Sequence, residues 1–124
     1  MIQVAERSPI SGELERFFVV AQIHQRETGR QAFMPVCPVD TEWHHMLKQS
    51  EEYQRFCQNA MEKDIRHEPA RGDGEIDWTG TYEKLFGPLP EVWFRGTDGI
   101  LDRSRRQRYI ETGVFYASWD CTPY

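Results

Sequence analysis

Apolar residues recur at helical spacing through the first part of the chain. Between Leu14 and Ala21 they stand three or four residues apart, which predicts a helix that Ser11 caps and Gly29 ends. Residues 30–38 contain two prolines and predict an extended connection. The chain is therefore expected to open with one long amphipathic helix.

Two shorter amphipathic helices are predicted next. Trp43, Met46 and Leu47 share one face of a helix that runs from an N-cap at Asp40 to about residue 49. Ser50 can cap the following helix, in which the apolar residues again follow helical spacing. The residues of that second apolar stripe are Tyr53, Phe56, Cys57, Ala60 and Met61.

Turns and further helices alternate in the second half of the chain. Segment 66–74 is polar and predicts turns. Residues 75–86 predict a fourth helix, which Gly87 and Pro88 end. Residues 101–111 predict a basic helix.

The aromatic tail over residues 114–119 predicts either a strand or an extended strap over the core. With no internal repeat and no interdomain linker, 124 residues predict a single domain with one core. The predicted fold class is mainly α: a compact domain spanning 1–124, with four or five helices and an extended aromatic C-terminal tail.

Composition narrows the classes of function. The formal net charge of -5 gives no general attraction to nucleic acid or to anionic membranes, so neither is an expected partner. No apolar run approaches the roughly 20 residues that a membrane helix needs. Cys37, Cys57 and Cys121 are irregularly spaced, which indicates free thiols rather than a disulfide framework. These features predict a cytoplasmic protein.

An ordered series of residues resembles a known family. Along residues 33–94 the series is Val39-Asp40-x-x-Trp43-His44, Tyr53-x-x-Phe56-Cys57, His67-x-Pro69 and Phe86-Gly87-Pro88. It is similar to the glycine-rich-domain-containing-protein-like family of bacteria and plants, whose hallmark is a Val-Asp-x-x-Trp-His-x-His-Leu motif. Met46 replaces the second histidine of that motif, and the glycine- and cysteine-rich tail of many members is missing. The family has no established chemistry, so the resemblance implies a domain and its special positions rather than an activity.

Four residues of the series are of types that bind metals or move protons. Asp40 and His44 stand four residues apart and share one helical face. If the two short helices form an antiparallel hairpin, His44 approaches Cys57, and His67 on the following loop closes the group. The set of Asp40, His44, Cys57 and His67 is acceptable for tetrahedral zinc, so zinc is the cofactor that the sequence suggests.

Two other interpretations of these residues stay open. Asp40 as a helix cap, with His44 as its partner, would form a buried polar network that only organises the fold. Cys57 with a histidine base would imitate an activated nucleophile, although its place on an apolar stripe predicts burial. The spacing also lacks the close C-x-x-C or H-x-x-x-H pairs of well-defined zinc sites. The sequence therefore favours a protein without catalytic activity.

Contacts with a partner are predicted at two places. Trp93 and Phe94 are adjacent, and since both rings cannot face the same way, part of their area is expected at the surface. A locally positive edge is predicted on the basic helix. The arginines of that edge are Arg103, Arg105, Arg106 and Arg108.

The function that the sequence favours is a non-enzymatic binding or adaptor domain. It would act through contacts with another protein or a second copy of the chain, and the cluster of Asp40, His44, Cys57 and His67 would organise its centre. The alternative is a small metalloprotein that uses this cluster, with hydrolytic or redox activity.

Overall fold

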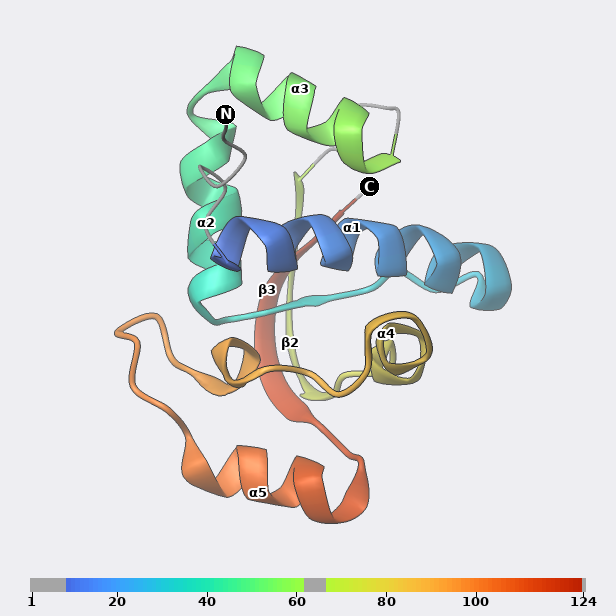
Figure 1. The fold of residues 1–124 in the computed structure, drawn as a ribbon, viewed down its shortest axis with the longest axis vertical. Helices are drawn as coiled ribbons and strands as arrows, with labels where there is room; N and C mark the ends of the chain where they lie inside the picture. The colour runs from blue at the N-terminus through green and yellow to red at the C-terminus, as the bar shows by residue number, and fades with distance from the viewer. Residues whose placement is uncertain (1–8, 62–66, 124) are drawn as a thin grey trace, which may run out of the picture.

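The computed structural model describes residues 9–61 and 67–123, without the side chains of residues 50, 52 and 58–61. Five α-helices, a 3-10 helix and three strands follow one another in this described part (Figure 1). In chain order they are α1 (Pro9–Thr28), β1 (Met34–Pro35), α2 (Pro38–Leu47), α3 (Ser50–Met61), β2 (His67–Glu75), α4 (Thr79–Phe86), the 3-10 helix η2 (Glu91–Phe94), α5 (Arg103–Thr112) and β3 (Tyr116–Pro123).

An aromatic core holds the helices together. In Figure 1, α1 runs across the middle of the molecule, with α2 on one side and α4 on the other. Phe17 of α1 meets Trp78 edge-on, with 5.3 Å between ring centroids, and its centroid lies 6.3 Å from that of Trp43 and 6.0 Å from that of Trp93. All three indoles are at most 1% exposed. The predicted first helix is therefore confirmed, and it is the centre of the core.

One carboxylate ties α1 to two of its neighbours. Glu13 Oε1 accepts a hydrogen bond from the Tyr82 hydroxyl of α4 and another, at 2.9 Å, from the Trp93 indole N–H of η2. Burial, and then the hydrogen bond to Glu13, raise the pKa of Tyr82 to about 12, so the phenol stays a donor. Glu13 thus satisfies two polar groups that the aromatic core would otherwise leave unpaired.

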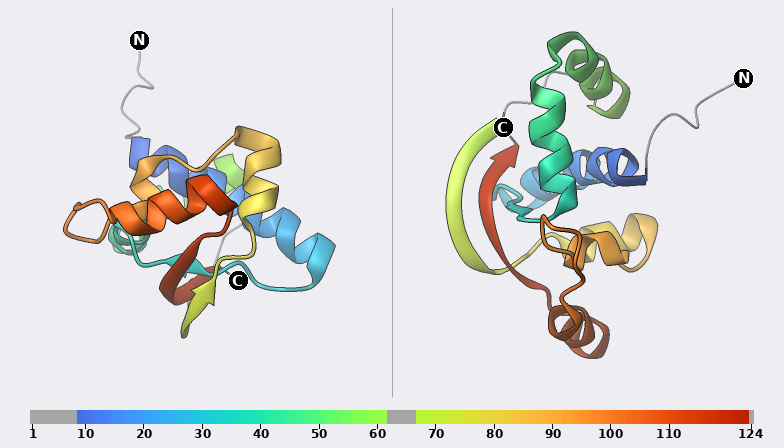
Figure 2. Two further views of the ribbon diagram at one scale, coloured as in Figure 1. Left: turned by 90° about the horizontal axis from the view of Figure 1, so that it is seen from below. Right: turned by 90° about the vertical axis from the view of Figure 1, so that its left-hand side faces the viewer.

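An antiparallel sheet with the strand order β1-β3-β2 accompanies the helices. Its central strand is β3, in which Cys121 pairs with Met34 of β1 on one side and with Pro69 of β2 on the other. In the right-hand view of Figure 2, β2 and β3 curve around one side of the molecule, with β2 outermost. The last strand of the chain is thus inserted between two earlier segments.

The sheet corrects one prediction and decides another. Residues 66–74, predicted as turns, hold most of β2, whose side chains are mostly exposed or half-buried. A strand at the edge of a sheet needs no alternating apolar pattern, so the polar composition concealed it. For the aromatic tail at 114–119, the sequence left a strand or an extended strap open, and the structure shows a strand, β3, which continues to Pro123. The fold is mainly helical with a small sheet.

The start of α2 differs from the predicted one. The helix begins at Pro38, and Cys37 is the N-cap residue. Proline lacks an N–H group, but the first position of a helix does not use one in the helical hydrogen bonds. Asp40 is therefore a first-turn residue rather than the cap. Its side chain is free to interact with another part of the fold.

Other helix boundaries also shift by a few residues. α1 begins at Pro9 rather than Ser11, and α4 begins only at Thr79. α3 begins at Ser50, whose side chain lies outside the described residues, so its predicted capping role is not described. The basic helix is α5, and Asp102 caps it by accepting a hydrogen bond from the Arg105 N–H at 3.0 Å.

A bulge in β2 lies opposite Asp120. Between the pairs Pro69–Cys121 and Gly72–Trp119, β2 has two residues where β3 has one. Such bulges bend a strand and re-aim its neighbours' side chains. The indole of Trp119 comes so close to Gly72 that an added Cβ would lie 2.8 Å from it.

Gly72→Ala is expected to lower the free energy of unfolding by about 1–3 kcal/mol, as overpacking usually does, because the new methyl group overlaps Trp119. Trp119 has little room to move away, since it stacks on Phe33 at 4.7 Å between centroids. Urea unfolding measures the effect. Gly12→Ala in α1 is the matched control: nothing lies within 4 Å of its added Cβ, and alanine stabilises a helix interior. Equal stability of Gly72→Ala and wild type would contradict the close packing.

Candidate metal centre

The donor atoms of five side chains gather where α2 meets the ends of β2 and β3, and we call these residues the donor cluster. Two overlapping sets have donor atoms that all lie within 4.8 Å of one another. The first set is His44, His67 and Cys121, and the second is Asp40, His44, Asp120 and Cys121. In the right-hand view of Figure 2, the arrowhead of β3 lies beside α2.

Asp40 is the central acceptor of the donor cluster. Its Oδ1 accepts a hydrogen bond from the Cys121 thiol at 3.2 Å and lies 3.2 Å from His44 Nε2. Asp40 is 5% exposed and Cys121 is 0% exposed, whereas the side chain of His44 is 45% exposed. The cluster therefore has a buried carboxylate and thiol on one side and an imidazole facing solvent on the other.

Burial sets the protonation states in the donor cluster. Loss of solvent raises the pKa of Asp40, and the charge of Asp120 acts in the same direction, against the hydrogen bond from Cys121 and the contact with His44. Burial likewise raises the pKa of Cys121, helped by the charge of Asp40, so the metal-free group is a thiol. The pKa of His67 is lowered, first by burial and then by the charge of His44, which favours a neutral imidazole.

Two buried polar atoms of the donor cluster have no hydrogen-bond partner among the described residues: His67 Nε2 and Asp120 Oδ1. Buried polar groups are nearly always paired, and leaving one unpaired costs about 1–3 kcal/mol. The His67 ring lies edge-on between Trp43 and His44, at 4.8 Å and 4.6 Å between centroids. A ring nitrogen and a carboxylate oxygen that both lack partners are groups that a metal cation would satisfy.

Cys57 does not belong to the donor cluster. It is fully buried in the apolar core on α3. α2 contacts α3 through Trp43, whose indole N–H donates to the Tyr53 hydroxyl at 2.9 Å, whereas His44 lies 3.2 Å from Asp40. The structure therefore does not bring Cys57 into a set of converging donors with Asp40, His44 or His67, and Cys121 supplies the thiol instead.

Sequence reasoning found three members of the donor cluster and missed two. It placed Asp40 and His44 on one helical face and added His67, and in the structure both Asp40 and His67 belong to sets that share His44 and Cys121, although the two do not belong to the same set. It missed Asp120 and Cys121, because no spacing rule links the C-terminal tail to α2. The available signal was an acidic residue next to a cysteine in a predicted strand.

Trp93 and Phe94 are not surface residues, contrary to the prediction. They are 1% and 2% exposed. Their rings enter two different parts of the core: Trp93 packs against Phe17, and Phe94 packs against Phe115 at 4.8 Å between centroids. The basic edge of α5 does lie at the surface, with Arg106 half-buried. Its exposed arginines are Arg103, Arg105 and Arg108.

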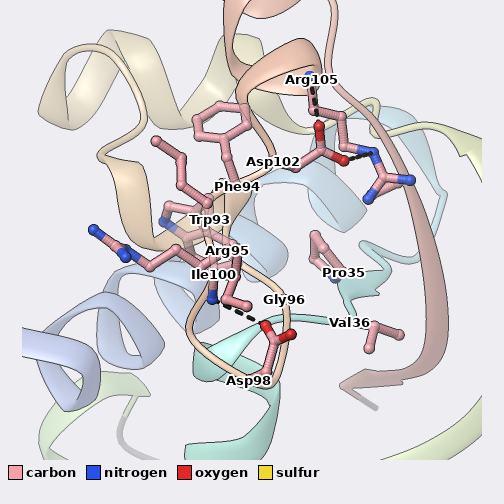
Figure 3. A pocket seen from close by; sticks show the side chains of 12 residues that line it. Pro35, Val36, Trp93, Phe94, Arg95, Gly96, Asp98, Ile100, Asp102 and Arg105 are labelled. Atoms are coloured by element: carbon pink, nitrogen blue, oxygen red, sulfur yellow. Dashed lines mark hydrogen bonds and ion pairs between the residues drawn. The ribbon is translucent and has the colours of Figure 1, made fainter.

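A hollow of about 280 Å³ lies between β1 and the turn that precedes α5 (Figure 3). Pro35 forms part of its apolar lining. Its acidic groups are already used: Asp98 accepts the Ile100 N–H at 2.9 Å, and Asp102 caps α5 and lies 3.8 Å from Arg105 Nε. We therefore place the candidate site at the donor cluster rather than here.

No family model, curated protein or solved structure matches this chain. The resemblance of residues 33–94 to the glycine-rich-domain-containing-protein-like family thus stays a prediction, and the interpretation of the site rests on its geometry. No helix in the described ranges has both the length and the apolar character to cross a membrane.

The raised pKa of Asp40 predicts how the metal-free protein responds to pH. A carboxyl whose folded pKa exceeds its ordinary value of 3.8 binds its proton more tightly in the folded state. Its contribution to stability is complete below 3.8 and is lost as pH rises through the folded pKa. In a chelator, Asp40→Asn should therefore lose less Tm than wild type as pH rises across this window.

Asp73→Asn is the control for this measurement, because Asp73 is an exposed carboxylate on β2, away from the cluster. Its Tm should follow the wild-type pH dependence. A steeper loss of Tm in Asp40→Asn than in wild type would contradict the raised pKa.

Proposed function

We propose that this chain is a non-enzymatic metal-binding domain that holds one divalent transition-metal ion between α2 and the ends of β2 and β3. The observation that carries the proposal is the convergence of imidazole, thiol and carboxylate donors in one place. Two of the polar atoms there, His67 Nε2 and Asp120 Oδ1, are buried without hydrogen-bond partners. Imidazole and thiolate favour zinc and its neighbours, whereas magnesium and calcium take oxygen ligands.

The shortest contacts in the donor cluster have the spacing of ligands around one ion. With tetrahedral angles and the usual zinc–ligand bond lengths, two ligand atoms lie about 3.3–3.5 Å apart. Asp40 Oδ1 lies 3.2 Å from both His44 Nε2 and Cys121 Sγ. Asp40 is thus at ligand spacing from both other residues, and the donor atoms of all three lie within 4.8 Å of one another.

A divalent ion would also relieve the electrostatic cost of the donor cluster. The carboxylates of Asp40 and Asp120 offer oxygens within 4.8 Å of each other, and burial disfavours charge on Asp40. An ion at this place supplies the missing positive charge and releases the thiol proton of Cys121. Because its ligands come from separate parts of the chain, the ion would fasten the sheet to α2.

The buried thiol supports a binding role rather than catalysis. A nucleophilic cysteine needs exposure and a lowered pKa. Cys121 is 0% exposed and its pKa is raised. The same side chain is well suited to metal coordination, because the ion itself displaces the thiol proton.

A contact surface for an acidic protein is the second candidate function. It is favoured by exposed apolar area on and beside the basic helix α5: Ile110 is 58% exposed and Tyr116 is 41% exposed, with the Arg108 guanidinium 5.2 Å from the Tyr116 ring centroid. Binding of a protein partner that survives chelation and fails on charge reversal of Arg108 would support this function.

The proposed function predicts that the reduced, metal-free protein takes up one zinc ion per chain in a calorimetric titration. At free zinc about 100-fold above Kd, the free energy of unfolding should rise by about 2.7 kcal/mol. Cys121→Ser should abolish most of this gain, since its hydroxyl is a much weaker zinc ligand. Cys57→Ser removes an equally buried cysteine outside the donor cluster and should keep the zinc response.

A second pair of variants tests the histidines without touching the core. His44 and His45 are adjacent and both exposed, but only His44 contacts Asp40. His44→Ala should weaken zinc binding and His45→Ala should not. A wild-type protein that binds neither zinc nor cobalt, or equal affinities in both variants of a pair, would refute the proposal.

A further inference from the structure

The five side chains of the donor cluster divide between two roles. Among the residues that the structure describes, one set of four has donor atoms that all lie within 4.8 Å of one another: Asp40, His44, Asp120 and Cys121. Four is the number of ligands that a tetrahedral zinc ion takes. We infer that these four residues bind the ion and that His67 is a positioning residue, which donates a hydrogen bond to the Cys121 thiolate; this inference rests on the proposed function.

The carboxylate of Asp120 belongs among the ligands. It converges with all three other members of the set, and its Oδ1 is buried and accepts no hydrogen bond from the described residues. A buried carboxylate oxygen without a donor is costly, and a cation removes that cost. Leaving Asp120 outside the coordination would keep this oxygen unpartnered after the ion is bound.

The end of β3 is irregular enough for two adjacent residues to reach the ion. Successive side chains of a regular strand point to opposite faces. Exposed and buried residues do alternate from Tyr116 to Ser118, but Cys121 and Thr122 are both buried. The bulge in β2 lies opposite Asp120, and bulges re-aim nearby side chains. Asp120 and Cys121 can therefore serve the same ion.

His67 lies on one side of the donor cluster only. It converges with His44 and Cys121, and no converging set holds it together with either carboxylate. The ligand atoms of a tetrahedral ion lie about 3.3–3.5 Å apart, so His67 would have to move toward both carboxylates to join them. Its ring is packed edge-on against Trp43 and His44, at 4.8 Å and 4.6 Å between centroids. An ion in the set of four is complete without it.

The ion would still give His67 a hydrogen-bond partner. In the metal-free protein the Cys121 thiol donates to Asp40 at 3.2 Å and is itself only a weak acceptor, while His67 Nε2 is buried without a partner among the described residues. A bound ion displaces the thiol proton, so the sulfur becomes a charged acceptor. An imidazole can donate from Nε2 in its neutral or its charged form.

Strand register places the two groups of this hydrogen bond together. Cys121 pairs with Pro69, and His67 precedes Pro69 by two residues, so His67 and Cys121 lie on the same face of neighbouring strands. The Cys121 side chain is 0% exposed, so the protein rather than bulk water has to supply a donor to its sulfur.

Charge explains why the thiolate needs this donor. Two carboxylates and one thiolate exceed the charge of a divalent ion by one negative unit. Zinc sites with three or four thiolates carry as large an excess or a larger one, and a hydrogen bond to a thiolate favours its charged form. Loss of such a partner of a ligand typically weakens metal affinity about 10–100-fold.

Cobalt(II) in place of zinc distinguishes a ligand from a positioning residue. Its visible ligand-field bands report the ligand set, and a near-ultraviolet charge-transfer band reports the cobalt–thiolate bond. Asp120→Asn replaces a charged ligand with a neutral amide and is expected to change the visible bands of the saturated protein. Asp73→Asn, which removes an exposed charge from the same sheet, should alter neither affinity nor spectrum.

His67→Phe keeps the packed ring and removes its nitrogens. It is expected to leave the visible bands unchanged, because the ligand set stays the same. The thiolate band should move to longer wavelength, because the sulfur holds its electrons less tightly, and cobalt and zinc affinity should fall about 10–100-fold. His67→Gln restores a side-chain N–H and should recover part of both effects.

The outcomes separate the inference from the proposal beneath it. Unchanged visible bands in Asp120→Asn would overturn its assignment as a ligand, and changed visible bands in His67→Phe would make the histidine a ligand instead; both leave metal binding intact. An unmoved thiolate band in His67→Phe would overturn the hydrogen bond. A wild-type protein without a cobalt–thiolate band would overturn the proposed function itself. Circular dichroism confirms that each variant is folded, and His67→Leu replaces His67→Phe if the latter does not fold.

Discussion

The pairing of β3 with both of its neighbours is the constraint on which the rest of the structure depends. Without it, Cys121 would have no reason to lie beside Asp40, a residue far from it in the sequence. The end of β3 is secured again by Thr122, which is 1% exposed and donates from its hydroxyl to the Ala32 carbonyl at 2.8 Å. Backbone pairing thus fixes the position of the donor cluster before any ion contributes.

Two polar networks in this molecule differ in one physical respect. Glu13 accepts hydrogen bonds from Tyr82 and Trp93, so these two donors of the aromatic core are satisfied. In the donor cluster, His67 Nε2 and Asp120 Oδ1 are buried without partners. Natural proteins break the rule of polar satisfaction mainly where function requires it. The first network therefore explains the fold, and the second is where a ligand is expected.

Local patterns predicted what is local in this protein. Helical spacing of apolar residues located α1, and the four-residue interval placed Asp40 and His44 on one face. The strand β2 escaped prediction because an exposed edge carries no apolar alternation. The choice of Cys121 over Cys57 also escaped, because both cysteines are buried and only long-range strand pairing separates their roles.

The size of the aromatic core limits what the proposed ion would have to do. Very small metal domains unfold without their metal because they have little else to bury. Here Phe17 and the indoles of Trp43, Trp78 and Trp93 form a packed core. Each indole N–H in it already has an acceptor within the protein: Tyr53 for Trp43, the Phe33 carbonyl for Trp78 and Glu13 for Trp93. The core can therefore hold the helices together while the donor cluster keeps unpaired atoms. The proposed ion would therefore act at the junction of α2 with the sheet, where it would offset the cost of burying carboxylates and unpaired atoms and would cross-link the two elements. The fold as a whole would not depend on it.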